Sequence, residues 1–93
     1  MDIYQLKTFV AVAREGSITR ASERVHLSQP AVSAHIKAIE DALGLALFER
    51  TSRGMSLTRD GERLLARAEQ TLAAHQELMD EATRIKGRLT GKL

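Results

Sequence analysis

The fold is decided by residues 17–44, which read SITRASERVHLSQPAVSAHIKAIEDALG. This stretch predicts two helices, because Ser17 and Ser28 can each cap a helix N-terminus with a side-chain oxygen. Pro30 falls in the first turn of the second helix, where its missing N–H needs no partner. Only residues 26–28 separate the two helices, and this arrangement is typical of a helix-turn-helix.

Apolar side chains recur at helical spacing along this stretch and indicate one buried face. On the second helix that face ends at Gly44, a residue type that favours a helix C-terminus. An earlier helix of the same periodicity is predicted to begin near Ile3 and to stop at Gly16. The residues of the helix-turn-helix that we expect to point inward are Ile18, Ala21, Ser22, Val25, Val32, Ile36, Ile39 and Leu43.

The pattern changes after Gly44. Two short strands are predicted at residues 45–50 and 55–57, because they flank the polar, glycine-containing turn 51–54. The predicted fold is therefore mainly α: a winged helix-turn-helix of three helices with a short two-stranded wing, followed by one long helix.

We expect two parts in the chain. Residues 1–58 are predicted to form the winged domain, with the helix-turn-helix at about 18–37 and the wing at about 46–57. Residues 59–93 are predicted to be a linker and dimerisation helix with the start of a hinge.

The long helix is the least ordinary prediction. Thr58 can cap it, and no proline interrupts it, so it should span roughly 30 residues, or on the order of 45 Å. Its wide apolar stripe, partly at seven-residue spacing, is typical of helices that pair. The winged domain is too small to cover the stripe, so we expect a homodimer through this helix. The expected dimer contacts are Leu65, Leu72, Leu78, Met79, Ala82 and Ile85.

Composition excludes several classes of protein. The chain has 93 residues with 14 Lys+Arg, 12 Asp+Glu and no cysteine, which excludes disulfide frameworks, thiol nucleophiles and cysteine-ligated metals. The three histidines are not at metal-ligand spacing, and no nucleophile motif or phosphate-binding glycine loop is present. We therefore expect no enzyme activity, no metal and no cofactor. The apolar run 9–13 is too short for a membrane span, and Asp2 does not suit a signal peptide, so a cytoplasmic protein without a membrane partner is expected.

The residues that could contact DNA lie on the polar side of the helix beginning at Gln29. In a helix-turn-helix the start of this helix enters the major groove, where glutamine can bond bidentately to adenine and serine to several base edges. Arg53, at the predicted wing tip, suits a minor groove or a phosphate. The alternative is a solvated polar face. The predicted base contacts are Gln29, Pro30, Ser33, Ala34 and Arg53, and the predicted phosphate or flanking contacts are Thr19, Arg20, Ser28, His35, Lys37 and Arg50. For His35 a partly buried structural role is an equal alternative.

The motifs resemble a known family. The segment Ala21-Ser22-Glu23-Arg24-Val25-His26-Leu27-Ser28-Gln29-Pro30-Ala31-Val32-Ser33, with Leu47-Phe48-Glu49-Arg50 and Leu57-Thr58-Arg59-Asp60-Gly61, is similar to the N-terminal domain of LysR-type transcriptional regulators.

This resemblance implies a bacterial regulator whose linker helices pair and whose two winged domains bind an interrupted inverted repeat in double-stranded DNA. Gln29, Pro30 and Ser33 match the family's base-contacting positions, and Arg53 matches its wing contact. Ala34 departs from the arginine that many members carry. The family's effector-binding domain is absent from these residues, so an effector would act only through a domain outside this chain, and we expect the chain to be a fragment of a longer regulator.

Two other functions remain open at this point. A winged-helix module that binds proteins and not DNA is the main alternative, because the net charge is only +2. Double-stranded RNA is a weaker alternative, because its deep, narrow major groove does not admit a helix.

Overall fold

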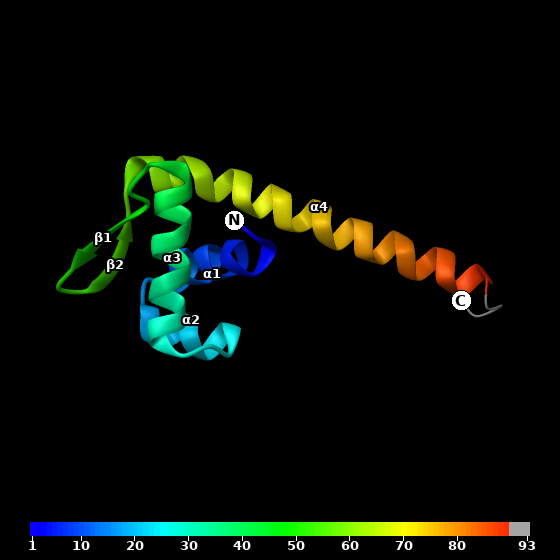
Figure 1. The fold of residues 1–93 in the computed structure, drawn as a ribbon, viewed down its shortest axis with the longest axis horizontal. Coiled ribbons are helices and arrows are strands. Elements are labelled where there is room, and N and C mark those ends of the chain that lie inside the picture. The colour runs from blue at the N-terminus through cyan, green and yellow to red at the C-terminus, as the bar shows by residue number, and fades with distance from the viewer. Residues whose placement is uncertain (90–93) are drawn as a thin grey trace.

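The structure is a computed structural model that describes residues 1–89. Three helices form a small domain, a hairpin extends from one side of it, and a long helix projects away from the other (Figure 1). The elements are α1 (Ile3–Glu15), α2 (Ile18–Val25), α3 (Gln29–Leu43), β1 (Phe48–Thr51), β2 (Gly54–Leu57) and α4 (Arg59–Leu89). The predicted winged helix-turn-helix with a long C-terminal helix is confirmed.

Short polar side chains set the helix starts. Asp2 caps α1, with its Oδ1 accepting from the Gln5 N–H at 2.9 Å. Ser17 caps α2 and Ser28 caps α3, each accepting at 3.2 Å from the backbone N–H three residues on. Because these caps satisfy N–H groups that have no partner inside the helix, they define where each helix begins.

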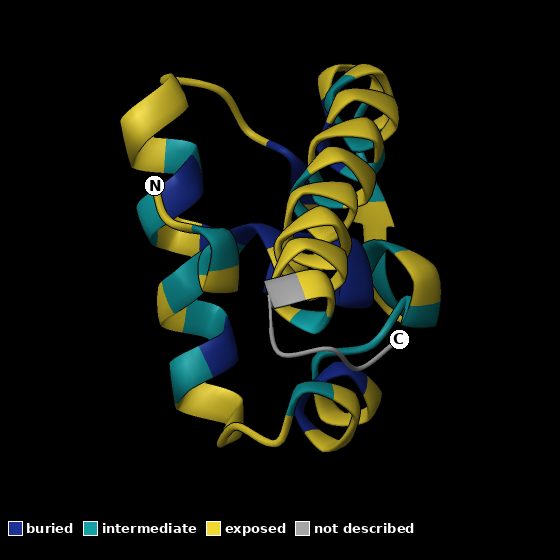
Figure 2. Ribbon diagram, turned by 90° about the vertical axis from the view of Figure 1, so that its right-hand side faces the viewer, coloured by how far each residue is buried: buried dark blue, intermediate teal, exposed yellow. Residues whose placement is uncertain are grey.

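The core lies where α1, α2 and α3 meet, and Phe48 of β1 and Ala68 of α4 add to it. The buried faces of the helices turn toward it (Figure 2). The ring of Phe9 on α1 meets that of Phe48 on β1 edge to face, with centroids 5.6 Å apart. This geometry is favourable for two aromatic rings. It joins the first helix to the wing. The most deeply buried side chains are those of Phe9, Ile39, Leu47, Val12, Val32 and Thr8.

Two predictions about the end of α3 are wrong. Leu43, expected inside, is 40% exposed, because it borders an open hollow that it shares with Phe9 and Leu64. Residues 45–47, expected to be strand, lie outside the hairpin, which pairs Phe48 with Leu57 and Thr51 with Gly54. The Glu40 carboxylate instead accepts from the N–H of Leu47 at 2.7 Å and of Phe48 at 3.4 Å. A helix side chain thus binds the N–H groups here, while the Leu47 carbonyl accepts from the Thr58 N–H at 2.9 Å.

The start of α4 is packed against the domain. Thr58 caps it by accepting from the Gly61 N–H at 2.9 Å, as predicted. Gly61 lies so close to the Leu47 carbonyl oxygen that a Cβ there would overlap it. Further along, Ala68 is buried, and Arg14 of α1 forms an ion pair with Glu69 at 2.6 Å. These contacts hold the first part of α4 on the domain.

Beyond these contacts α4 projects alone (Figure 1). It is a single helix through Gly87 to Leu89. Residues 90–93, at the end of the segment predicted to include the start of a hinge, lie outside the described part of the chain. Within residues 1–89, no helix is long and apolar enough to cross a membrane.

Candidate nucleic-acid interface

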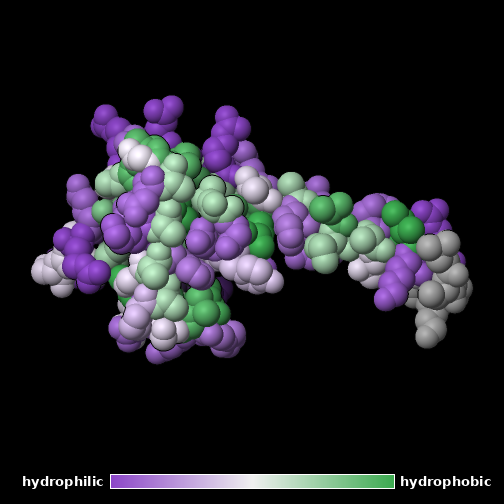
Figure 3. All heavy atoms as spheres, in the orientation of Figure 1, coloured by the Kyte–Doolittle hydropathy of each residue, from purple (hydrophilic) through white to green (hydrophobic). Residues whose placement is uncertain are grey.

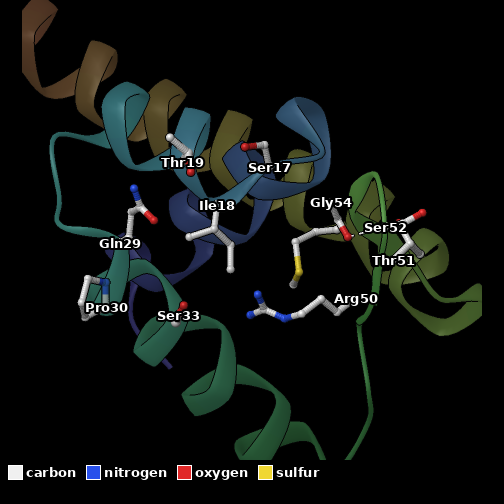
Figure 4. A pocket seen from close by; sticks show the side chains of 11 residues that line it. Ser17, Ile18, Thr19, Gln29, Pro30, Ser33, Arg50, Thr51, Ser52 and Gly54 are labelled. Atoms are coloured by element: carbon white, nitrogen blue, oxygen red, sulfur yellow. Dashed lines mark hydrogen bonds between the residues drawn. The ribbon is translucent and has the colours of Figure 1, made fainter.

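The N-termini of α2 and α3 and the hairpin surround one open cavity of about 590 Å³. In Figure 4 the Arg50 side chain extends from the hairpin toward Ser33 of α3. The cavity therefore joins the helix-turn-helix to the wing. Its lining residues are Ser17, Ile18, Thr19, Gln29, Pro30, Ser33, Arg50, Thr51, Ser52, Gly54 and Met55.

The first turn of α3 presents three of the predicted base-contact residues to this cavity. Gln29 and Pro30 are exposed and Ser33 is half-buried, and all three line the cavity. Ala34 is exposed on the same helix but does not line the cavity. Ser28 is exposed as well, yet its hydroxyl already accepts from the Ala31 N–H at 3.2 Å, so it fixes the helix start. Gln29 is left as the side chain with the most free hydrogen-bonding groups at this end of α3.

The wing carries two arginines with different surroundings. Arg50 lines the cavity, whereas Arg53 lies at the tip, in the turn between the two strands, and does not line it. The turn is held by Thr51, whose hydroxyl accepts from the Arg53 N–H at 3.2 Å and donates to the Gly54 carbonyl at 3.2 Å. The backbone around Arg53 is thus ordered while its side chain is exposed.

Not all of the predicted phosphate or flanking residues line the cavity. Thr19 lines the cavity, while Arg20 is exposed beside it on the first turn of α2. Lys37 is exposed, and its Nζ lies 3.5 Å from Asp41, a weak contact between solvated groups.

His35 turns away from the cavity toward α1. Its Nδ1 lies 2.9 Å from the Oγ1 of Thr8, and the ring is half-buried. Of the two roles predicted for His35, this contact favours the structural one.

Sequence reasoning missed six residues that line the cavity. The sequence predicts Ser17 as a helix cap and residues 51–54 as a turn, but neither pattern shows that both border the same cavity. The polar composition of the turn was the only available signal. The residues missed are Ser17, Ile18, Thr51, Ser52, Gly54 and Met55.

The predicted dimer contacts fall into two groups. Leu65 and Leu72 are half-buried and pack partly against the domain's own core. Leu78, Met79 and Ile85 are 66%, 51% and 45% exposed, and Figure 3 shows apolar side chains among polar ones along the projecting helix. Ala82 is exposed as well. The apolar stripe is thus covered by the domain only along its first half.

Charged groups along α4 form local contacts. Arg84 donates to Glu81 at 2.7 Å, and this hydrogen bond raises the pKa of the Arg84 guanidinium above its ordinary value. Within residues 1–89, no three side chains of His, Cys, Asp or Glu gather in a way that could hold a metal ion.

Comparison with known proteins identifies the family. The model described as "Bacterial regulatory helix-turn-helix protein, lysR family" matches residues 3–62. The chain belongs to the LysR family. Its fold is similar to that in a crystal structure of the CbnR DNA-binding domain with DNA, with a TM-score of 0.86, 36% identity, and 92% of this chain and 99% of that chain covered. A complex of the BenM DNA-binding domain with catB site 1 DNA gives a TM-score of 0.88 and 32% identity over 92% of this chain and 97% of that one.

The curated relatives are longer than this LysR-family chain. An uncharacterized HTH-type transcriptional regulator of Azotobacter vinelandii is 41% identical over 93 residues, which is 100% of this chain and 65% of that protein. The regulator PcaQ of Agrobacterium fabrum is 45% identical over 78 residues, 84% of this chain and 25% of that protein. The chain is therefore the DNA-binding domain of a LysR-type transcriptional regulator, and this family is not one of enzymes.

Proposed function

We propose that this LysR-family domain binds duplex DNA sequence-specifically, as a dimer, with α3 in the major groove and Arg53 in or beside the minor groove. The observation that carries the proposal is the shared cavity, because the first turn of α3 and the hairpin border the same hollow. A helix in the major groove and a hairpin over the neighbouring minor groove need this kind of relative placement.

Base recognition is assigned to the first turns of α3. The Gln29 amide can donate to and accept from one adenine at once, and the Ser33 hydroxyl can serve either function. Pro30 and Ala34 offer apolar surface to thymine methyl groups. Because the Ala34 side chain has no hydrogen-bond donor, Gln29 is the main residue of α3 that distinguishes one base from another by hydrogen bonds.

Phosphate contacts are assigned to residues around the cavity and beside it. The Arg50 guanidinium lies over the cavity, and Thr19 and Arg20 occupy the first turn of α2, where backbone N–H groups favour anions. Ser28 completes the start of α3, and Lys37 lies further along that helix. We assign His35 to holding α3 against α1, because its Nδ1 contacts Thr8.

The dimer is assigned to α4, with a second copy of this chain as partner. The exposed Leu78, Met79 and Ile85 need apolar cover that the domain does not supply. Two winged domains related by a two-fold axis then match an interrupted inverted repeat.

The longer regulator that contains this domain is assigned to the bacterial cytoplasm, where the DNA is. Binding of an effector is assigned to a region outside this chain, because the curated relatives extend well beyond the matched residues.

The proposal is tested by selecting duplexes from a random library and measuring binding by fluorescence anisotropy. We expect a selected duplex to bind at least 10³-fold tighter than a scrambled one. Log affinity should fall with log salt by about 0.9 for each phosphate contacted. Equal, salt-insensitive affinity for both duplexes would contradict sequence-specific binding and favour a protein-interaction module.

A further inference from the structure

Gly54 lies where the wing touches the rest of the domain. It is the first residue of β2 and has a φ of 125°, a conformation that side chains other than glycine's rarely adopt. The next residue, Met55, donates its N–H to the carbonyl oxygen of Gly16 at 3.0 Å. The inner strand of the wing is therefore bonded to the corner between α1 and α2.

At Gly54 there is no room for a side chain on the face toward this corner. A Cβ at Gly54 would overlap the carbonyl oxygen of Gly16, which is a backbone atom. That carbonyl cannot easily yield. The Gly16 N–H donates to the Val12 carbonyl at 2.8 Å, and the adjacent Ser17 caps α2. Because two helices hold Gly16 in place, the hairpin has to move if Gly54 gains a methyl group.

Movement of the hairpin would be concentrated at its tip. The base of the wing is held by the Glu40 carboxylate, which accepts from the N–H groups of Leu47 and Phe48. The tip is a turn in which Thr51 bonds to the Gly54 carbonyl and to the Arg53 N–H. A displaced Gly54 therefore displaces Arg53, while α3 keeps its own contacts with the core.

We propose that Gly54 is a positioning residue that sets the place of Arg53 relative to α3, and with it the contribution of the minor groove to sequence recognition. This inference rests on the proposed DNA-binding mode. Beyond that binding mode, sequence recognition would depend on a close backbone contact between Gly54 of the wing and Gly16, which leaves no room for a side chain at residue 54.

The test compares Gly54→Ala with Gly44→Ala in the 93-residue chain. Gly44 also has a positive φ, 69°, but a Cβ there meets nothing within 4 Å, so this variant adds a methyl group at a left-handed glycine without any overlap. Fluorescence anisotropy measures the DNA affinity of the wild type and of both variants. One library-selected duplex is used in three forms: unmodified, with 2,6-diaminopurine in place of adenine, and with 7-deazaadenine in place of adenine. Diaminopurine adds an amino group in the minor groove, and 7-deazaadenine removes an acceptor from the major groove.

For the wild type we expect diaminopurine to weaken binding about tenfold. In Gly54→Ala this penalty should fall toward onefold while the 7-deazaadenine penalty is unchanged, and the Met55 amide should exchange its hydrogen faster. Gly44→Ala should keep both penalties. A wild type that prefers no duplex refutes the proposed function. A wild type that binds specifically, with a diaminopurine penalty that survives in Gly54→Ala, refutes the positioning role alone.

A second variant separates the overlap from the conformation of residue 54, and it applies even if Gly54→Ala fails to fold. Chemical synthesis can place D-alanine at position 54, which tolerates a positive φ and carries its methyl group on the opposite side of Cα. We expect this protein to keep the wild-type diaminopurine penalty. Loss of the penalty in the D-alanine protein would overturn the inference, because the overlap with Gly16 would then not be the cause.

Discussion

The Oγ1 atom of Thr8 lies 2.9 Å from Nδ1 of His35, and this contact joins α1 to the helix proposed to recognise DNA. The Thr8 hydroxyl also donates to the Tyr4 carbonyl at 3.0 Å. A hydroxyl has one proton, so both bonds form together when His35 carries its proton on Nδ1. Because Thr8 is only 1% exposed, its hydroxyl depends on these two protein partners and not on water.

Thr8→Val should therefore destabilise the domain. It keeps the shape of the side chain but leaves the His35 N–H without its acceptor, which costs about 1–3 kcal/mol. Urea unfolding followed by circular dichroism measures the change. Thr71→Val is the matched control, because the Thr71 hydroxyl is exposed and bonds only to the Arg67 carbonyl of its own helix. Equal losses in the two variants would show that the Thr8–His35 bond contributes nothing particular.

Gln29→Ala should weaken binding to a selected duplex by about 1–3 kcal/mol and binding to scrambled DNA much less, because a bidentate contact to a base is lost. Anisotropy titrations on both duplexes measure the difference. Gln76→Ala, an exposed glutamine on α4 that bonds to Asp80, is the control and should leave both affinities unchanged. If the two duplexes lose affinity equally in Gln29→Ala, Gln29 does not read a base.

Arg53→Ala should weaken binding to both duplexes with a smaller change in base preference than Gln29→Ala, because the loss includes a charge near the phosphates. The salt dependence of binding should also become less steep, by about 0.9 if one phosphate contact is lost. An unchanged slope together with unchanged affinity would place Arg53 outside the interface. Arg24→Ala, on the exposed end of α2, serves as the comparison for removing a surface arginine.

Met79→Asp should shift the chain from dimer to monomer. Light scattering at micromolar concentration should give about twice 10.3 kDa for the wild type, as expected for helices that pair, and about half that for the variant. Met79 is 51% exposed and makes no core contact, so the fold should survive, which the thermal melt checks. Gln70→Asp adds the same charge without removing apolar surface and should remain dimeric. A wild type that scatters as a monomer would remove the role proposed for α4.

Gly61→Ala should destabilise the domain, although glycine to alanine inside a helix normally stabilises by up to about 1 kcal/mol. The sign reverses because the new Cβ would overlap the Leu47 carbonyl oxygen, and the Leu57 side chain would lie 3.0 Å from it. Urea unfolding measures the effect. A more stable variant would mean that α4 can shift away from the loop before the wing without cost.

Much of the fold could be predicted because its signals are local. Ser17 and Ser28 cap helices through atoms three residues away, and Gly16 and Gly44 end helices through their own backbone conformation. Such contacts depend on neighbouring residues, so a pattern along the chain is enough to find them.

The errors arose where a long-range partner decides the outcome. The segment before β1 looked like strand, but the Glu40 carboxylate takes up its N–H groups. Leu43 matches the apolar spacing of α3, yet the open hollow between α3 and α4 leaves it 40% exposed. The sequence allows two roles for His35, and its contact with Thr8, a residue 27 positions away, favours the structural one.

The sequence by itself determined the helix boundaries, the presence of a wing and the candidate DNA contacts at Gln29, Ser33 and Arg53. Caps, turns and amphipathic spacing depend on residues that are close together in the chain, so the sequence is enough to find them. Only the tertiary structure decided that Gly54 lies against Gly16 and that part of the α4 stripe packs on the domain itself. Both facts depend on distances between segments far apart in the chain, and such distances are set by how whole elements pack.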